Sequence, residues 1–460
     1  MILRSVAEQV LAAALVTGGD FAELFCEDRR TGTMGLVDSH VENATTLRTH
    51  GAGIRIYNGL NSVYVHTNDT SLSGLLSAAG KAADAVSGSA IHGDVRLIRS
   101  IPANVHPIRQ MPMDVAGARK ARLLREMDLS ARAVSGEISQ VRASLIYWDS
   151  DVLIANSEGL YTADRRVYTR MACSAVAEGN GESQSGSASP GAMMGFELFE
   201  GRVDVAEQAR IAAQRAVTML HADPCPAGVM PVVIDGGFGG VIFHEACGHS
   251  LEAQAVAFGN SEFAGKLGQT IASPIVTAVD DGTLPGEWGS LNIDDEGTPT
   301  TRLVLIKDGV LVNYMVDRLN GRRMGLPPTG SARRQDYTFA PTSRMRNTYI
   351  AAGTDDEAEI IAGCPDGLYA KSMGGGSVNP VTGAFNFAVA EGWLIRNGAV
   401  DRPVRGATLI GRGAEILKRI DRVGSNMWMS QGMCGASSGS IPTNVGQPMI
   451  RVTEMTVGGR

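Results

Sequence analysis

The chain has 460 residues, of which 44% are hydrophobic and 19% charged, and its formal net charge is −7. This composition excludes a disordered chain and argues against direct nucleic-acid binding, which needs a basic surface. Arginines do cluster locally, and we interpret the cluster as salt-bridged strands: Arg333, Arg334, Arg344 and Arg346. No apolar run reaches roughly 18 residues, so the sequence predicts no transmembrane helix and no membrane partner.

The start of the chain and the cysteines both predict a cytoplasmic protein. The apolar stretch from Val10 to Thr17 follows Glu8 and Gln9, and no small-residue cleavage site comes after it, so we expect a helix there and not a signal peptide. The six cysteines lie far apart and form no C-x-x-C pair. In a chain of this length, such cysteines are typical of buried thiols and not of a disulfide framework.

The first half of the chain is predicted to alternate helices with β-hairpins. Helices are expected over residues 6–16, 70–85, 115–134 and 203–220, with Ser71 as an N-cap. Strands are expected over residues 22–29, 41–48, 51–57, 62–66, 141–149, 152–156 and 161–176, with a hairpin turn at Asn58-Gly59. Residues 179–195 are rich in Gly, Ser and Asn and are predicted to form a loop.

Two prolines between residues 221 and 228 suggest a domain boundary, which we place between residues 224 and 225. Beyond it, a buried strand at 231–234 precedes a helix, and the chain from residue 275 onward reads mostly as β structure, with hairpins over 303–316 and 393–403 and a helix over 414–423. The predicted class is therefore α+β. It combines an N-terminal antiparallel sheet with flanking helices, residues 1–224, and a β-rich domain carrying a metal-binding helix, residues 225–460.

The most informative stretch runs from Gly236 to Glu252 and reads GGFGGVIFHEACGHSLE. It contains His244, Glu245 and His249. Two imidazoles can bind zinc, and the neighbouring glutamate can accept a proton from water, which is the chemistry of a hydrolytic metal site.

The spacing of the two histidines is HExxxH and not HExxH. On an ideal α-helix, residues i and i+5 point about 140° apart, so His244 and His249 could not face one metal ion. A π-bulge would align them, or the helix could end near Gly248. In both cases the sequence predicts a departure from α geometry between Ala246 and His249.

A catalytic zinc ion needs a third protein ligand. Candidates in this sequence are Glu252, Asp280, Asp281, Cys247 and Cys434. Cys247 is interpreted as a buried apolar residue that points away from the histidines. Cys434 lies in the glycine-flanked loop Gly432-Met433-Cys434-Gly435 and is the preferred candidate, because a thiolate with two imidazoles selects zinc.

Several blocks of sequence resemble, in the same order, the TldD subunit of the TldD/PmbA (TldE) family of zinc metallopeptidases. They include PAGVMPVVIDGGFGGVIFHEACGHSLE, VDDGTLPGEWGSLNIDDEGTPTT, MGLPPTGSARRQDY and GLYAKSMGGGSVNPVTGAFNFAVAEGWLI. The resemblance implies zinc ligands at His244, His249 and Cys434, and a catalytic glutamate at Glu245. It also implies hydrolysis of unfolded or short peptides, and a homodimer or a heterodimer with a PmbA/TldE-like subunit.

Two other functions remain open at this point. A deformylase also uses two histidines, a glutamate and a cysteine, but its chain is shorter and its cysteine precedes the motif. A non-enzymatic modulator or partner protein would hold a structural zinc, with Glu252 or Cys247 completing a closed four-ligand shell. An association of the family with DNA gyrase adds a related alternative, although the acidic composition argues against direct DNA contact.

Overall fold

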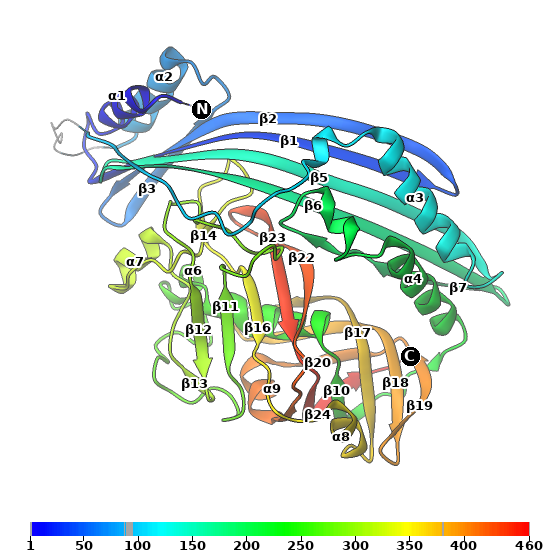
Figure 1. Ribbon diagram of the computed structural model, residues 1–460. Helices are drawn as coiled ribbons and strands as arrows, with labels where there is room; N and C mark the ends of the chain where they lie inside the picture. The colour runs from blue at the N-terminus through cyan, green and yellow to red at the C-terminus, as the bar shows by residue number, and fades with distance from the viewer. Residues whose placement is uncertain (1, 87, 89–94, 380, 460) are drawn as a thin grey trace.

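The computed structural model describes residues 2–86, 88, 95–379 and 381–459. A long curved sheet forms one layer, and it lies over a second body made of a barrel and a smaller sheet (Figure 1). The α+β class predicted from the sequence is confirmed. Among the described residues, no helix has the length and apolar character needed to cross a membrane.

The long sheet has the strand order β3-β2-β1-β5-β6-β4, and β7 and β8 also pair with β6. Its strands are β1 (Phe21–Val37), β2 (His40–Asn58), β3 (Asn61–Thr67), β4 (Ile98–Ser100), β5 (Ile138–Asn156), β6 (Leu160–Gly179), β7 (Glu182–Ala188) and β8 (Gly191–Ala192). The helices are α1 (Arg4–Ala14), α2 (Leu72–Asp84), α3 (Gly117–Arg132) and α4 (Val205–Leu220). Ser71 caps α2, as predicted, by accepting a hydrogen bond from the Gly74 N–H.

Three predictions for this half were wrong. The expected strands 41–48 and 51–57 form one continuous strand, β2, because β1 pairs with it along its whole length. The expected strands 141–149 and 152–156 likewise form one strand, β5, which pairs with the other side of β1. The expected loop 179–195 contains β7 and β8. Its small side chains serve packing: a Cβ at Gly186 would lie 2.1 Å from the Ala212 carbonyl oxygen of α4, so only glycine lets the helix approach this closely.

The second body contains a barrel. Its sheet has the order β17-β10-β24-β20-β18-β19-β9, and an additional pairing of β17 with β18 closes five strands into a ring. The strands are β9 (Asp223–Pro224), β10 (Gly228–Ile234), β17 (Asp366–Val378), β18 (Ala384–Arg396), β19 (Ala399–Arg405), β20 (Thr408–Arg412), β21 (Ile420–Val423) and β24 (Ile450–Gly458). The expected helix 414–423 is shorter: α9 (Gly413–Arg419) gives way to β21, which pairs with β24.

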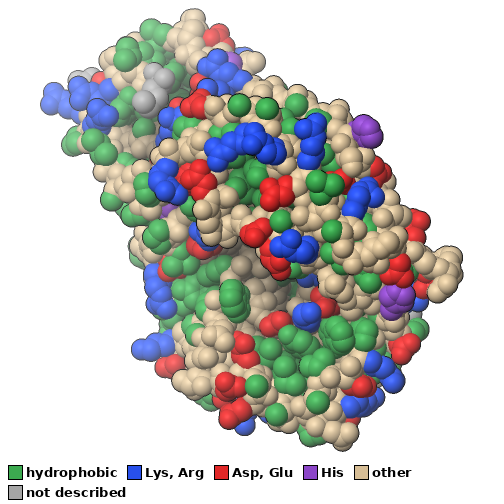
Figure 2. All heavy atoms as spheres, turned by 45° about the vertical axis from the view of Figure 1, so that its right-hand side comes forward, with side chains coloured by type: hydrophobic (Ala, Val, Ile, Leu, Met, Phe, Trp, Pro, Cys, Tyr) green, Lys and Arg blue, Asp and Glu red, His purple; other side chains and the backbone are tan. Residues whose placement is uncertain are grey.

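A smaller sheet has the order β13-β12-β11-β16-β23-β22. Its strands are β11 (Ala278–Asp281), β12 (Arg302–Lys307), β13 (Val310–Leu311), β16 (Asn347–Ile350), β22 (Trp428–Ala436) and β23 (Gly439–Gln447), and β14 (Ala332–Arg333) pairs with β15 (Thr342–Ser343) nearby. The remaining helices here are α5 (Val241–Phe243), α6 (Ala253–Val256), α7 (Arg318–Met324) and α8 (Glu357–Ala362). β22 lies between the long sheet and the barrel, and the surface below the long strands is hollowed (Figures 1 and 2).

Buried ion pairs join the long sheet to the second body. The Arg55 guanidinium donates to Glu23 Oε2 at 2.9 Å and to Glu296 Oε1 at 2.6 Å, and Arg334 contacts Glu23 Oε1 at 2.7 Å. Burial raises the pKa of Glu23, but the charges of Arg55 and Arg334 outweigh burial and hold the pKa below its ordinary value. Because all four side chains are at most 2% exposed, these pairs are shielded from solvent.

We expect Arg55→Met to destabilise the protein by about 3–5 kcal/mol, because it leaves two buried carboxylates without their shared cation. The measurement is the midpoint of urea unfolding. Arg396→Met is the matched control, since its partner Asp366 and Arg396 itself are 62% and 49% exposed and the loss should stay below about 1 kcal/mol. Equal shifts in the two variants would contradict the structural role of the buried cluster.

Candidate metal site

The segment that carries the motif departs from α geometry where the sequence predicted it. After β10, a 3₁₀ turn (Gly237–Gly240) leads into α5, and His244–Gly248 then forms a π turn followed by a 3₁₀ turn over His249–Leu251. The His249 N–H donates to the His244 carbonyl oxygen, which is the i to i+5 bond of a π-helix. This turn brings side chains five residues apart onto one side of the segment.

Glycines let the motif segment pack closely against its neighbours. A Cβ at Gly240 would lie 2.6 Å from backbone atoms of Gly446 in β23, and a Cβ at Gly413 in α9 would lie 2.3 Å from the Ala246 carbonyl oxygen. A Cβ at Gly248 would lie 2.2 Å from Met345 Sδ. The segment therefore packs closely against β23, α9 and the Met345 side chain.

Three side chains converge at the π turn. His244 Nε2 and His249 Nε2 each lie 3.3 Å from Cys434 Sγ. The three ligand atoms all lie within 4.8 Å of one another, and the two imidazole rings are nearly perpendicular at 83°. Cys434 comes from β22, about 190 residues from the motif, so β22 is the element that brings the thiol to the histidines.

Glu245 lies at the open side of this group. Its Oε2 is 3.7 Å from His249 Nε2, and its side chain is 29% exposed, compared with 13% for His249. Its carboxylate is therefore the side chain of the motif that solvent or a substrate can reach most readily.

Glu252 holds the other side of the His249 ring. Its Oε2 lies 3.0 Å from His249 Nδ1, while its Oε1 accepts from the Met345 N–H at 3.2 Å. Arg344 lies 3.8 Å from the same carboxylate and donates to the Cys434 carbonyl oxygen at 2.6 Å. The sequence offered Glu252 as a possible third ligand, but here it orients a ligand from behind, as a metal-binding histidine usually requires.

Charge stabilises the thiolate. Burial raises the pKa of the Cys434 thiol, but the charges of His244 and His249 and their hydrogen bonds outweigh burial and lower the pKa to about 3. For His249, burial lowers the pKa, but the Glu252 and Cys434 charges raise it well above its ordinary value. Both shifts favour the charged form of each side chain, the thiolate of Cys434 and the imidazolium of His249.

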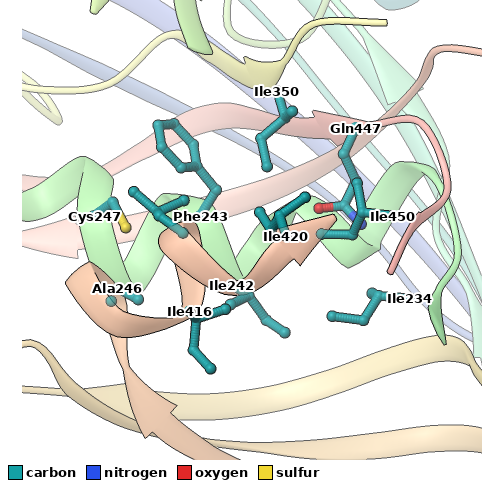
Figure 3. Close-up of a pocket in the computed structure, with 12 residues that line it drawn as sticks. Ile234, Ile242, Phe243, Ala246, Cys247, Ile350, Ile416, Ile420, Gln447 and Ile450 are labelled. Atoms are coloured by element: carbon teal, nitrogen blue, oxygen red, sulfur yellow. The ribbon is translucent and has the colours of Figure 1, made fainter. Parts of the chain in front are cut away.

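The other candidate ligands lie elsewhere. Cys247 lies at a small apolar cavity with Ile242, Ala246 and Ile416, on the side of the motif segment that faces α9 (Figure 3). The space enclosed is about 10 Å³, close to that of one water molecule, and burial raises the pKa of the Cys247 thiol. This agrees with its interpretation as an apolar core residue.

The two aspartates offered as ligands are engaged in structural contacts. Asp280 accepts from the Arg346 N–H and Nε, both at 2.7 Å, and Asp281 accepts from the Thr283 N–H at 2.8 Å.

The sequence did not predict the role of Arg344, because the arginine cluster was interpreted only as a source of salt bridges. Arg334, Arg344 and Arg346 do approach carboxylates, whereas the Arg333 guanidinium donates to the backbone carbonyls of Met345 and Pro442.

We expect Gly240→Ala to destabilise the protein by about 1–3 kcal/mol, because the new Cβ meets backbone atoms that cannot rotate away. The displaced motif segment should also bind zinc more weakly in a calorimetric titration. Gly80→Ala in α2 is the control: its Cβ would meet nothing within 4 Å, so this variant should be as stable as the wild type or up to about 1 kcal/mol more stable. A Gly240→Ala variant with unchanged stability would refute the close approach to β23.

Comparison with known proteins covers nearly the whole chain. Three family models match in order: PmbA/TldA metallopeptidase domain 1 over residues 22–86, the central domain over 112–220 and the C-terminal domain over 227–459. A metalloprotease TldD homolog from Haemophilus influenzae is 37% identical over 452 residues, which are 96% of this chain and 93% of the relative. A zinc metalloprotease TldD homolog from Saccharolobus solfataricus is 30% identical over 247 residues, 54% of this chain and 55% of the relative.

Solved structures share the fold. A candidate modulator of DNA gyrase from Bacteroides thetaiotaomicron aligns over 100% of both chains with a TM-score of 0.80 and 18% identity. TldE from Thermococcus kodakarensis aligns over 99% of this chain and all of its own, with a TM-score of 0.76 and 18% identity. The matched family domains and the identity to the Haemophilus relative show that this chain belongs to the PmbA/TldD metallopeptidase family.

Proposed function

We propose that this protein is a zinc metallopeptidase that hydrolyses peptide bonds in unfolded or short peptides. The observation that carries the proposal is the convergence of His244 Nε2, His249 Nε2 and Cys434 Sγ beside the Glu245 carboxylate. The curated relatives named metalloproteases support the class of reaction.

The donor set fits zinc. Two imidazole nitrogens and one thiolate are borderline-soft ligands that favour zinc over magnesium or calcium. Three protein ligands also leave a coordination position open, as catalytic zinc sites require. The alternative of a closed structural site would need Glu252 or Cys247 as a fourth ligand. Glu252 bonds the far ring nitrogen of His249, and Cys247 lies among apolar side chains, so neither supports that alternative.

Each side chain has a distinct role in the proposed reaction. A bound zinc ion would supply the Lewis acidity that makes water a nucleophile near neutral pH. Glu245 would take a proton from the attacking water and pass it to the leaving amine, and its partly exposed carboxylate, 3.7 Å from His249 Nε2, supports that role. Glu252 would hold His249 in one ring orientation, with Nδ1 bonded and Nε2 turned towards the metal position.

An extended peptide is the substrate that the surrounding strands favour. In β17, Gly375, Gly376 and Ser377 are exposed. β10 pairs only with residues 368–370 of that strand, so within the described residues the outer edge of the glycine-rich stretch has no strand partner. Backbone groups there could bind the main chain of a substrate, which would suit unfolded chains.

We also propose a cytoplasmic location and a partner subunit of the same fold, either a second copy or a PmbA/TldE-like chain. All six cysteines are free thiols, as expected in a reducing compartment. The likeness to TldE from Thermococcus kodakarensis supports a partner of this architecture.

Zinc affinity should fall by at least about tenfold for each pH unit below the raised His249 pKa, because His249 must lose a proton when zinc binds while the Cys434 thiolate, with a pKa of about 3, releases none. The sign follows from the raised His249 pKa: the imidazolium stabilises the metal-free protein fully at low pH, and this stabilisation is lost as pH rises through the raised value. Titration calorimetry in buffers of different ionisation enthalpy counts the proton. Glu252→Gln is the comparison variant, since loss of the charge should shift the dependence to lower pH.

We expect the wild type to hold about one zinc ion per chain and Cys434→Ser to lose most of it, because the thiolate is replaced by a weak ligand. Glu245→Gln should keep its zinc but cleave an unfolded peptide about 10²–10⁴-fold more slowly, since only the proton acceptor is removed. Metal analysis and peptide cleavage are measured on the same samples. If Cys434→Ser holds as much zinc as the wild type, Cys434 is not a ligand. If Glu245→Gln cleaves normally, another group is the base.

A further inference from the structure

We propose that Trp428 forms a subsite for a large apolar or aromatic side chain of the peptide substrate, an inference that rests on the proposed peptidase function. Trp428 is the first residue of β22, the strand that carries Cys434. It is 63% exposed, although an indole gains more from burial than almost any other side chain. Single exposed apolar residues are common on protein surfaces, so the inference depends on where this indole lies.

The indole and the thiol share one face of β22. Alternate residues of a strand point to the same side, which groups Trp428, Ser430, Gly432 and Cys434. The two residues in the middle have small side chains and are partly exposed. Six steps of extended strand separate the Cα atoms of Trp428 and Cys434 by about 20 Å. A peptide that follows this face from the metal position therefore reaches the indole about six residues from the cleaved bond.

The turn that opens the metal-binding segment holds the indole in place. A Cβ at Gly236 would lie 2.7 Å from Trp428 Cδ1, and a Cβ at Gly237 would lie 3.6 Å from Trp428 Cβ. Gly237 also has a φ of 67°, which L side chains rarely adopt. The turn thus has room for one edge of the indole because both residues are glycine. A ring already held on one side loses little freedom when a ligand covers the exposed part.

The indole also lies close to the strand edge that we propose for the substrate main chain. Asp235, which precedes Gly236, donates its N–H to the Ala370 carbonyl oxygen of β17 at 3.1 Å. Pairing of β17 with β10 ends at Ala370, so the free stretch of that edge starts beside this turn. An extended peptide that binds there begins or ends near Trp428. The occupant favoured by this arrangement is therefore an unfolded peptide with an apolar side chain.

Peptide binding to the Glu245→Gln variant tests the subsite without cleavage. Two labelled, unfolded peptides of Gly, Ser and Thr are compared by fluorescence anisotropy, one with a single central Phe and one with Ser in its place. The Phe peptide should bind about five- to tenfold more tightly, because its ring covers the exposed indole. Adding Trp428→Ser should abolish this difference, whereas adding Trp428→Phe should preserve most of it.

Val229→Ser in the same background is the matched control. Val229 is 61% exposed, but it lies near the start of β10, whereas the motif turn follows the end of that strand. This change should leave the preference for the Phe peptide intact. Equal affinities for the two peptides, a preference that survives Trp428→Ser, or a preference that Val229→Ser also removes would each overturn the proposal.

The positions of the cuts made by the wild type separate this proposal from the peptidase proposal. Product masses should place the single Phe about five to seven residues from the cut, and Trp428→Ser should scatter the cuts. If the Phe peptide binds more tightly through Trp428 but is never cleaved, the subsite stands and the peptidase proposal fails. If both peptides are cleaved equally fast, at positions unrelated to Phe, the subsite is refuted and the peptidase proposal stands.

Discussion

The site depends on a single constraint, which is that two side chains five residues apart must face one point. An α-helix separates them by about 140°, and the π turn at His244–Gly248 removes this separation. A π turn has poorer packing than an α turn, so it persists only where neighbouring elements hold it. Gly240 against β23 supplies that hold, since its backbone contact is too close for any side chain larger than hydrogen, and Gly248 packs against the Met345 side chain. The same glycines that make the segment pack closely also position its ligands.

Arg344 links β22, which carries Cys434, to the segment that carries the two histidines. Arg344 reaches the Cys434 carbonyl oxygen on β22 and lies beside Glu252, which in turn bonds His249. The backbone position of the thiol and the ring orientation of one histidine therefore depend on one guanidinium that is fully buried. Arginine suits this place because its planar, permanently charged group can serve two acceptors at fixed angles, which the single ammonium of lysine cannot do.

Local signals in the sequence predicted much of this arrangement. The HExxxH spacing predicted the departure from α geometry, and the Asn58-Gly59 turn and the helix cap at Ser71 lie where they were expected. The errors come from tertiary packing. The Gly- and Ser-rich stretch 182–188 is a strand because α4 lies against it, and the role of Glu252 depends on which ring nitrogen it meets. Pattern and spacing do not contain such information. The domain boundary at residues 224 and 225 stays a prediction.

The metal site also depends on distant parts of the chain, because they hold β22, the strand that carries Cys434, in position. The Trp288 indole donates to the Gly432 carbonyl oxygen at 2.8 Å, and the Gln431 side chain donates to Ser189, which follows β7 of the long sheet. Buried pairs between Arg55, Glu23 and Glu296 fix that sheet to the second body. Cys434 follows Gln431 and Gly432 on β22. Its place beside the histidines therefore depends on contacts that these two residues make with Ser189 and Trp288, far earlier in the chain. The long sheet is thus part of the framework of the metal site, even though it contributes no ligand.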